Sequence, residues 1–319
     1  MRAAIIGLGV IGKVHLEVLE KQGENIVALC DVDIEKLGEY EGVKKYLNYK
    51  TMLDVEKIDV VHICTPHYLH AEMVIYALNQ GINVLCEKPL CISNEQIDAV
   101  LEAEKKSSAK LGVCFQNRYN NSSAFAKKYL ADKEIEYAFG NVRWHRDQAY
   151  YQTADWRGKW ATEGGGVLIN QAIHTLDLLQ WIVGEPKKVC GGTFNLALKD
   201  VIEVEDTACA DFWDERKFTL FATNTSPQDM PIELRFFTKN EVVTVTPDDV
   251  KINGKTVDFD KDFKWFVKRS YGNGHEKLIK DFYECLESGR KFSIDGAEGA
   301  KALKAVLAVY KSRGEVVEI

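Results

Sequence analysis

The sequence of 319 residues has little of what marks membrane proteins and nucleic-acid-binding proteins. No apolar run approaches the ~20 residues that a helix needs to cross a bilayer. Lys and Arg number 41 against 48 Asp and Glu, which gives a net charge of −7, and the basic residues form no cluster. Nucleic acids and anionic membranes both require concentrated positive charge. The composition therefore disfavours both kinds of partner.

The sequence also has no C-x-x-C pair among its eight cysteines. Several of them stand inside apolar runs, such as the one that ends at Cys30. Buried thiols in a reducing compartment explain this distribution better than a disulfide framework or a zinc site does. At the N-terminus, Met1 and Arg2 lead directly into an apolar run at residues 3–7, which is typical of a strand rather than of a signal peptide. We therefore expect a cytoplasmic protein.

The length is about twice the ~150 residues of a single domain, so two domains are expected. The first 117 residues alternate short apolar runs with amphipathic helical patterns, as parallel strands buried on both faces do. Thr65 is expected to cap a helix with Pro66 at its first position, and Ser93 with Gln96 forms a capping box. The predicted strands cover residues 3–7, 26–31, 60–65, 82–87 and 111–116. This pattern predicts an α/β fold with a doubly wound parallel sheet over residues 1–117.

Residues 118–319 have a different pattern, in which strands follow one another without intervening helices. Such runs predict an α+β domain with a mostly antiparallel sheet. Helices are expected at 122–131, 168–183, 275–288 and 297–312. Strands are expected at 189–196, 207–213, 218–223, 232–238 and 242–246. No internal repeat or low-complexity linker separates the two domains.

A G-x-G-x-x-G motif, Gly7 to Gly12, follows the first predicted strand and opens the first predicted helix. In this context Gly7 permits a tight turn, Gly9 lets the backbone approach a pyrophosphate, and Gly12 allows close helix–strand packing. Asp31 is the last residue of the second predicted strand, where an acidic residue accepts hydrogen bonds from an adenosine ribose. Its charge would repel a 2′-phosphate, so the sequence predicts NAD in preference to NADP.

Two further segments carry side chains suited to chemistry. Lys88 follows the apolar run that ends in Glu87 and precedes Pro89, so it is expected at the carboxyl end of a strand, where ligands of α/β sheets bind. A lysine there can accept a proton if burial lowers its pKa. Farther on, a triple glycine leads into a helix on which Asn170, His174 and Asp177 share one stripe. That stripe fits the floor of a polar substrate site, and a capped helix with a hydrogen-bonded histidine is the alternative.

Taken together, the motifs resemble those of the Gfo/Idh/MocA oxidoreductase family, named for glucose–fructose oxidoreductase and inositol dehydrogenase. The resemblance runs from residue 1 to about 180, with a further similarity at residues 271–275. The motifs that carry it are the glycine fingerprint, Thr65-Pro66-His67-x-x-His70, Glu87-Lys88-Pro89, Gln116-Asn117-Arg118-Tyr119, Gly164-Gly165-Gly166 with His174-x-x-Asp177, and Tyr271-Gly272-Asn273-Gly274-His275.

The resemblance implies a Rossmann domain followed by an α/β domain with an open, mostly antiparallel sheet. It also implies hydride transfer between a nicotinamide cofactor and a hydroxyl of a sugar, sugar derivative or cyclitol. It implies that Lys88 and His174 are the catalytic residues and that both contact substrate, together with Arg118 and Asn170. It also implies a dimer or tetramer joined through the C-terminal sheet. The residues expected to bind the cofactor are Gly7, Leu8, Gly9, Val10, Ile11, Gly12, Asp31, Thr65, Pro66, His67, His70, Glu87, Lys88, Gln116, Trp156, Arg157 and Tyr271.

One position departs from the family pattern. Many relatives carry Asp four residues before the histidine, whereas this chain has Asn170, which cannot take a proton. Any general acid/base role at this position passes to Lys88 or His174. Two other functions remain open: a redox-neutral reaction on a retained, recycling cofactor, and a non-catalytic dinucleotide sensor. His62, His67 and His70 stand close in sequence, but their spacing does not fit one metal ion, and we expect no metal site.

Overall fold

The computed structural model describes residues 1–38, 40, 42–260 and 273–319. The described residues form two compact units. The first unit combines Met1–Phe115 with His275–Ala300, and the second combines Gln116–Gly274 with Lys301–Ile319. The functional division of the chain at residue 117 stays a prediction. Within the described residues, none of the helices has the length and apolar character needed to cross a membrane.

The first unit is built on a parallel sheet, as predicted. Its neighbouring strands all pair in parallel, in the order β3-β2-β1-β4-β5-β6, which is the order of a Rossmann fold. Residues Val60–Ile63 are buried throughout, because helices cover both faces of the sheet. The strands in the described part are β1 Arg2–Ile6, β2 Asn25–Cys30, β3 Lys44–Tyr46, β4 Val60–Ile63, β5 Asn83–Glu87 and β6 Leu111–Cys114.

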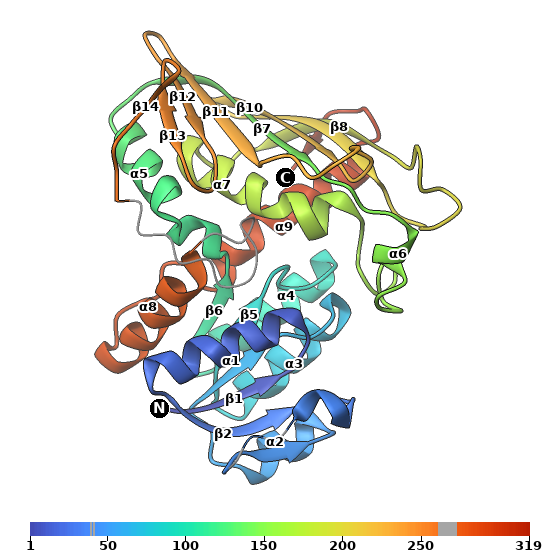
Figure 1. Ribbon diagram of the computed structural model, residues 1–319, viewed down its shortest axis with the longest axis vertical. Helices are drawn as coiled ribbons and strands as arrows, with labels where there is room; N and C mark the ends of the chain where they lie inside the picture. Colours follow the sequence, from blue (N-terminus) through green and yellow to red (C-terminus); the bar gives the residue numbers. More distant parts are fainter. Residues whose placement is uncertain (39, 41, 261–272) are drawn as a thin grey trace. The chain divides into compact units, whose positions relative to one another are not determined.

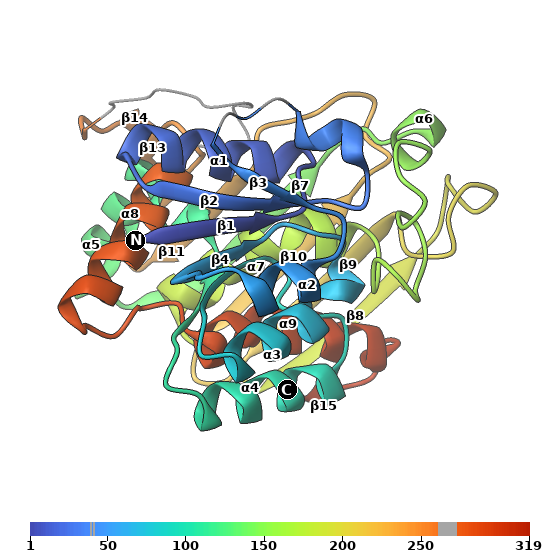
Figure 2. The same ribbon diagram turned by 90° about the horizontal axis from the view of Figure 1, so that it is seen from below.

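Helices lie on both faces of this sheet (Figures 1 and 2). His62 on β4 contacts His15 of α1 and Tyr283 of α8, so these two helices share one face. Helices α3 and α4 pack against each other on the opposite face. The helices of this unit are α1 Val10–Gln22, α2 Tyr49–Val55, α3 His67–Asn79, α4 Asn94–Lys106, α8 Gly274–Ser288, the first part of α9 Gly296–Ser312, and the 3₁₀ turn η1 Ile34–Leu37.

The helices begin and end near the glycine, serine and proline residues that predicted their ends, with one difference from the prediction. Gly23 ends α1 in the left-handed conformation, with φ of 72°. The backbone N–H of Gln96 donates to the Ser93 hydroxyl at 3.3 Å, which confirms the capping interaction at the start of α4. Pro66 lies at the N-cap of α3 rather than at its first helical position, because the helix begins only at His67.

The second unit holds a mixed sheet in the order β14-β13-β12-β11-β7-β10-β9-β8-β15. Neighbouring strands are antiparallel except β7 and β10, which pair in parallel. Strand β7, which lies between β10 and β11, was not predicted from the sequence. The strands are β7 Ile135–Arg143, β8 Lys188–Phe194, β9 Thr207–Trp213, β10 Lys217–Thr223, β11 Glu233–Thr238, β12 Val242–Val245, β13 Val250–Ile252, β14 Lys255–Thr256 and β15 Val317–Glu318.

Helix α7 packs closely on this sheet. A Cβ at Gly140 of β7 would lie 2.8 Å from a methyl carbon of Thr175, so glycine is needed for the close approach of strand and helix. The expected helix at 168–183 is in two parts, a π-helical turn followed by α7. The helical elements of this unit are η2 Gln116–Tyr119, α5 Asn121–Leu130, α6 Gln148–Tyr151, the π-helical turn η3 Leu168–Ala172, α7 Ile173–Val183, and α9 from Lys301 onward.

The face of this sheet that points away from α7 carries half-exposed aromatic side chains. Tyr137 and Phe237 lie opposite each other on β7 and β11, with ring centroids 5.6 Å apart. Phe139 of β7 and Phe221 of β10 lie on the same face, at half-exposed positions that alternate with buried ones.

All eight cysteines are free; six are buried, Cys190 is half-buried, and Cys209 on β9 is exposed.

Candidate functional site

The glycine loop between β1 and α1 has the geometry that dinucleotide binding requires. Gly7 has φ of 92°, and a Cβ there would lie 2.6 Å from the carbonyl oxygen of Cys64. A Cβ at Gly12 would lie 1.8 Å from the carbonyl oxygen of Gly7. At Gly9, the N-cap of α1, a Cβ would meet nothing within 4 Å. The open space at Gly9, beside the positive end of α1, fits a pyrophosphate.

Asp31 lies directly after β2, at the same edge of the sheet. Its carboxylate accepts the backbone N–H of Leu8 at 2.7 Å and that of Asp33 at 3.0 Å. These bonds fix the carboxylate against the glycine loop, where an adenosine ribose would bind. Lys36 Nζ lies 3.7 Å from the Asp31 carboxylate, a neighbour that the sequence analysis did not single out.

His70 joins the ends of two neighbouring strands. Its Nδ1 lies 2.7 Å from the carbonyl oxygen of Pro89, and its Nε2 lies 2.8 Å from that of Thr65. Burial lowers the pKa of His70, while the two carbonyl contacts act in the opposite direction. The ring thus connects the loops after β4 and β5, and its role in cofactor binding stays a prediction. His67, at the first position of α3, is also buried.

Lys88 immediately follows β5 and is half-buried. Its backbone N–H donates to the Glu87 carboxylate at 3.2 Å. Burial by itself would raise the pKa of Glu87, but His15 and His275 outweigh that effect and hold the pKa well below its usual range. The strand end that carries Lys88 is therefore anchored through a buried, ionised carboxylate.

In the second unit, Asp177 of α7 and Asn170 of the preceding π-helical turn have different partners, although the sequence predicted one shared stripe. Asp177 is 1% exposed, and its carboxylate forms a bidentate pair with Arg118 at 2.8 and 2.6 Å. The Arg118 side chain also lies over the ring of Trp181. The stripe predicted Asp177 in the floor of a substrate site, but its carboxylate is instead buried in an ion pair with Arg118. The guanidinium of Arg118 is thus held by Asp177 and Trp181. Gln116, which begins the same 3₁₀ turn as Arg118, is buried.

Asn170 lies in the π-helical turn and donates from its Nδ2 to the carboxylate of Glu163. Glu163 is buried, and its other oxygen accepts the backbone N–H of Gly158 at 2.5 Å. An acidic residue is therefore present beside Asn170, although it comes from a preceding turn. His174, at the second position of α7, is half-buried like Asn170.

Replacing Asn170 by Asp would place two carboxylates in contact, which strongly raises the pKa of one of the two. We expect the Asn170→Asp variant to retain its stability in acid and to lose about 1–3 kcal/mol, relative to the wild type, as pH rises through that raised pKa. Denaturant unfolding between pH 5 and 8 measures this loss of stability. The turnover of the variant should not exceed that of the wild type. Asn170→Ala, which adds no charge, should lose a pH-independent amount, and a wild-type pH profile for Asn170→Asp would contradict the interpretation.

The triple glycine is shaped around a buried carboxylate that the sequence analysis missed. Glu205 accepts the backbone N–H groups of Gly166 at 2.8 Å and Leu168 at 3.0 Å, and the Tyr310 hydroxyl at 2.9 Å. A Cβ at Gly166 would lie 1.9 Å from the Glu205 carbonyl oxygen. Burial raises the pKa of Glu205 to about 7, against the opposing effect of these hydrogen bonds. The loop before Asn170 is therefore fixed by contacts from residues far along the chain.

Trp156 and Arg157 belong to an aromatic group of the second unit. The Arg157 guanidinium donates to the Tyr150 hydroxyl at 2.6 Å and lies 4.7 Å from the centroid of the Trp156 ring. These two contacts position the guanidinium of Arg157, which is predicted to bind the cofactor. Tyr271, also predicted to bind cofactor, lies outside the described residues.

Comparison with known proteins identifies the family. The model of an oxidoreductase family with an NAD-binding Rossmann fold, Gfo/Idh/MocA, matches residues 1–115. The model of the C-terminal domain of the same family matches residues 126–243. Together the two matches cover most of the chain.

Individual relatives extend the similarity over the full length. Myo-inositol 2-dehydrogenase of Thermotoga maritima is 24% identical over 99% of this chain and 97% of its own. The WlbA dehydrogenase of Bordetella pertussis, solved in complex with NADH and UDP-GlcNAcA, is 28% identical with a TM-score of 0.87 and covers 100% of this chain and 98% of its own. Myo-inositol 2-dehydrogenase of Lactobacillus plantarum is also 28% identical, with a TM-score of 0.83, over 100% of this chain and 99% of its own. The chain belongs to the Gfo/Idh/MocA family of oxidoreductases.

Proposed function

We propose that the protein is an NAD-dependent dehydrogenase that transfers a hydride between a secondary alcohol carbon of a sugar, sugar derivative or cyclitol and the nicotinamide. The observation that carries this proposal is a glycine loop of dinucleotide-binding geometry in a chain that also holds Lys88 at the end of β5. Relatives matched over nearly the whole chain are named as dehydrogenases of inositol, and one was solved with a nucleotide sugar.

The reaction removes two electrons and two hydrogens from the alcohol. The cofactor supplies the hydride acceptor, and the hydroxyl proton goes to Lys88 or His174, which leaves a ketone. Asn170 cannot take a proton, but its amide is oriented by the hydrogen bond to Glu163. We assign to its Oδ1 the role of accepting a hydrogen bond from a substrate hydroxyl. Lys88 is then the principal proton acceptor.

A spectrophotometric screen tests the function. Sugars, sugar acids, cyclitols and nucleotide sugars are mixed with the protein and NAD⁺, and the absorbance of NADH is followed. Substrate-dependent release of NADH supports a dehydrogenase. Conversion of a sugar without released NADH indicates a redox-neutral reaction on a retained cofactor, and cofactor binding without conversion of any substrate indicates a sensor.

Cofactor preference is a separate prediction. Asp31 is expected to disfavour a 2′-phosphate by about 1–3 kcal/mol, so NAD should bind roughly 10- to 100-fold more tightly than NADP. Lys36, 3.7 Å from Asp31, reduces this repulsion, so Lys36→Gln should widen the difference. Titration of both cofactors by fluorescence measures the two affinities. Tighter binding of NADP would contradict the role of Asp31.

We also propose that the protein forms a dimer or tetramer through the outward face of the second sheet. Half-exposed aromatic residues on that face include Phe139 and Phe221, and monomers rarely expose contiguous apolar patches of large area. Light scattering should give a mass of at least twice 36.1 kDa. Phe139→Lys should reduce it, whereas Glu102→Lys on α4 should not. A 36.1 kDa wild-type particle would refute the proposal.

The eight free cysteines fit our proposal of a cytoplasmic location.

A further inference from the structure

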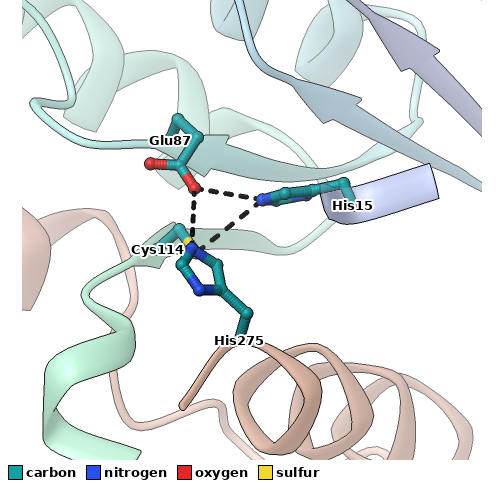
Figure 3. A group of neighbouring side chains, drawn as sticks. All are labelled: His15, Glu87, Cys114 and His275. Atoms are coloured by element: carbon teal, nitrogen blue, oxygen red, sulfur yellow. Dashed lines mark hydrogen bonds and ion pairs between the residues drawn. The ribbon is translucent and has the colours of Figure 1, made fainter. Parts of the chain in front are cut away.

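Four buried side chains of the first unit meet at one point (Figure 3). His15 comes from α1, Glu87 from the end of β5, Cys114 from the end of β6, and His275 from the start of α8. Their exposed fractions are 0%, 5%, 0% and 3%. One nitrogen, oxygen or sulfur atom from each residue lies within 4.8 Å of all the others.

The separations fit four ligands of a single metal ion. His15 Nε2 lies 3.0 Å from Glu87 Oε1, His275 Nε2 lies 3.8 Å from the same oxygen, and Cys114 Sγ lies 4.0 Å from His15 Nε2. Zinc bonds of about 2.0–2.3 Å in a tetrahedron place ligand atoms roughly 3.3–3.6 Å apart. The observed values bracket this range, whereas only the first is a good hydrogen-bond length.

The charges of the cluster also match a divalent cation. A thiolate at Cys114 and a carboxylate at Glu87 supply two negative charges, and the two imidazoles bind as neutral ligands. A divalent ion would therefore make the buried site electrically neutral.

A second layer of hydrogen bonds can orient the first ligand. His15 Nδ1 lies 2.8 Å from His62 Nδ1, and His62 Nε2 lies 2.9 Å from the Tyr283 hydroxyl. With Nε2 of His15 on a metal, its Nδ1–H donates to His62, whose Nε2–H donates to the tyrosine oxygen. Metal-bound histidines nearly always have such a partner on the other nitrogen.

We propose that His15, Glu87, Cys114 and His275 form a structural, tetrahedral site for Zn²⁺ in the Rossmann unit. All four positions are filled by protein, so the site leaves none for substrate, and its role is distinct from hydride transfer. Zinc is favoured over magnesium or calcium because the set contains one sulfur and two nitrogen donors. Coordination of Glu87 would fix the backbone that carries Lys88, the next residue.

Metal content and cobalt spectroscopy of the whole chain test the site. The protein is stripped with a chelator and then titrated with Zn²⁺ or Co²⁺ alone. Cys114→Ser removes the sulfur ligand, and His275→Gln removes a ligand from another element. The matched control is Cys86→Ser, a buried cysteine on the neighbouring strand β5 that is not among the four.

The site predicts one zinc ion per wild-type chain after reconstitution and dialysis, a rise in Tm on adding Zn²⁺, and tetrahedral Co²⁺ absorption with a sulfur charge-transfer band. Cys114→Ser should lose that band, both ligand variants should bind Zn²⁺ at least ~100-fold more weakly, and Cys86→Ser should bind like the wild type. Wild-type protein that takes up neither ion, or Cys114→Ser that keeps the charge-transfer band, would overturn the proposal and leave a hydrogen-bonded cluster.

Discussion

Lys88→Met is expected to lower turnover by ~10²–10⁴-fold, because it removes the group that accepts the alcohol proton. Affinity for NAD should change far less, since the glycine loop and Asp31 provide most of that binding. Steady-state kinetics over a range of pH, together with cofactor titration, measures both effects. The loss should appear in kcat and in kcat/KM alike, as expected for an interaction made in the transition state.

Matched variants separate proton transfer from charge. Lys88→Arg keeps the positive charge but cannot exchange a proton near neutral pH, so it should be almost as slow as Lys88→Met. His174→Asn should also slow the reaction, and the double variant should lose less than the sum of the two if the residues act as a unit. Near-normal turnover in Lys88→Met would show that the lysine is structural.

Arg118→Met should destabilise the protein by about 3–5 kcal/mol, because it leaves the Asp177 carboxylate buried without its partner. Denaturant unfolding measures this loss. Arg118→Met combined with Asp177→Leu removes both charges and should recover part of the stability. If Arg118 instead serves mainly to bind substrate, the single variant keeps its stability and shows only a raised KM.

Much of the first unit could be predicted because its information is local. Parallel strands buried on both faces appear as short apolar runs, and glycine, serine and proline mark the ends of the helices between them. The strand β7 was missed because Glu136 and Asn141 interrupt its apolar pattern. Its place between β10 and β11 is set by pairing with strands distant in sequence.

The contacts that organise the candidate site are long-range, and this limits what sequence reasoning finds. Glu205 meets Gly166 from 39 residues away, and Arg118 meets Asp177 from 59 residues away. Spacing on an ideal helix predicted one shared stripe for Asn170, His174 and Asp177, but a π-helical turn precedes α7. Likewise, Cys114 and His15 are 99 residues apart, so the four-residue cluster could not be read from any local motif.

Direct hydride transfer from a secondary alcohol carbon to NAD is the central claim. The measurement that tests it most directly uses a substrate found in the screen, labelled with deuterium at the carbon to be oxidised. After turnover, mass spectrometry of the reduced cofactor should show the gain of one deuterium, with the corresponding ketone as product. Reduced cofactor without deuterium, or no reduced cofactor with any sugar or cyclitol, would contradict the account.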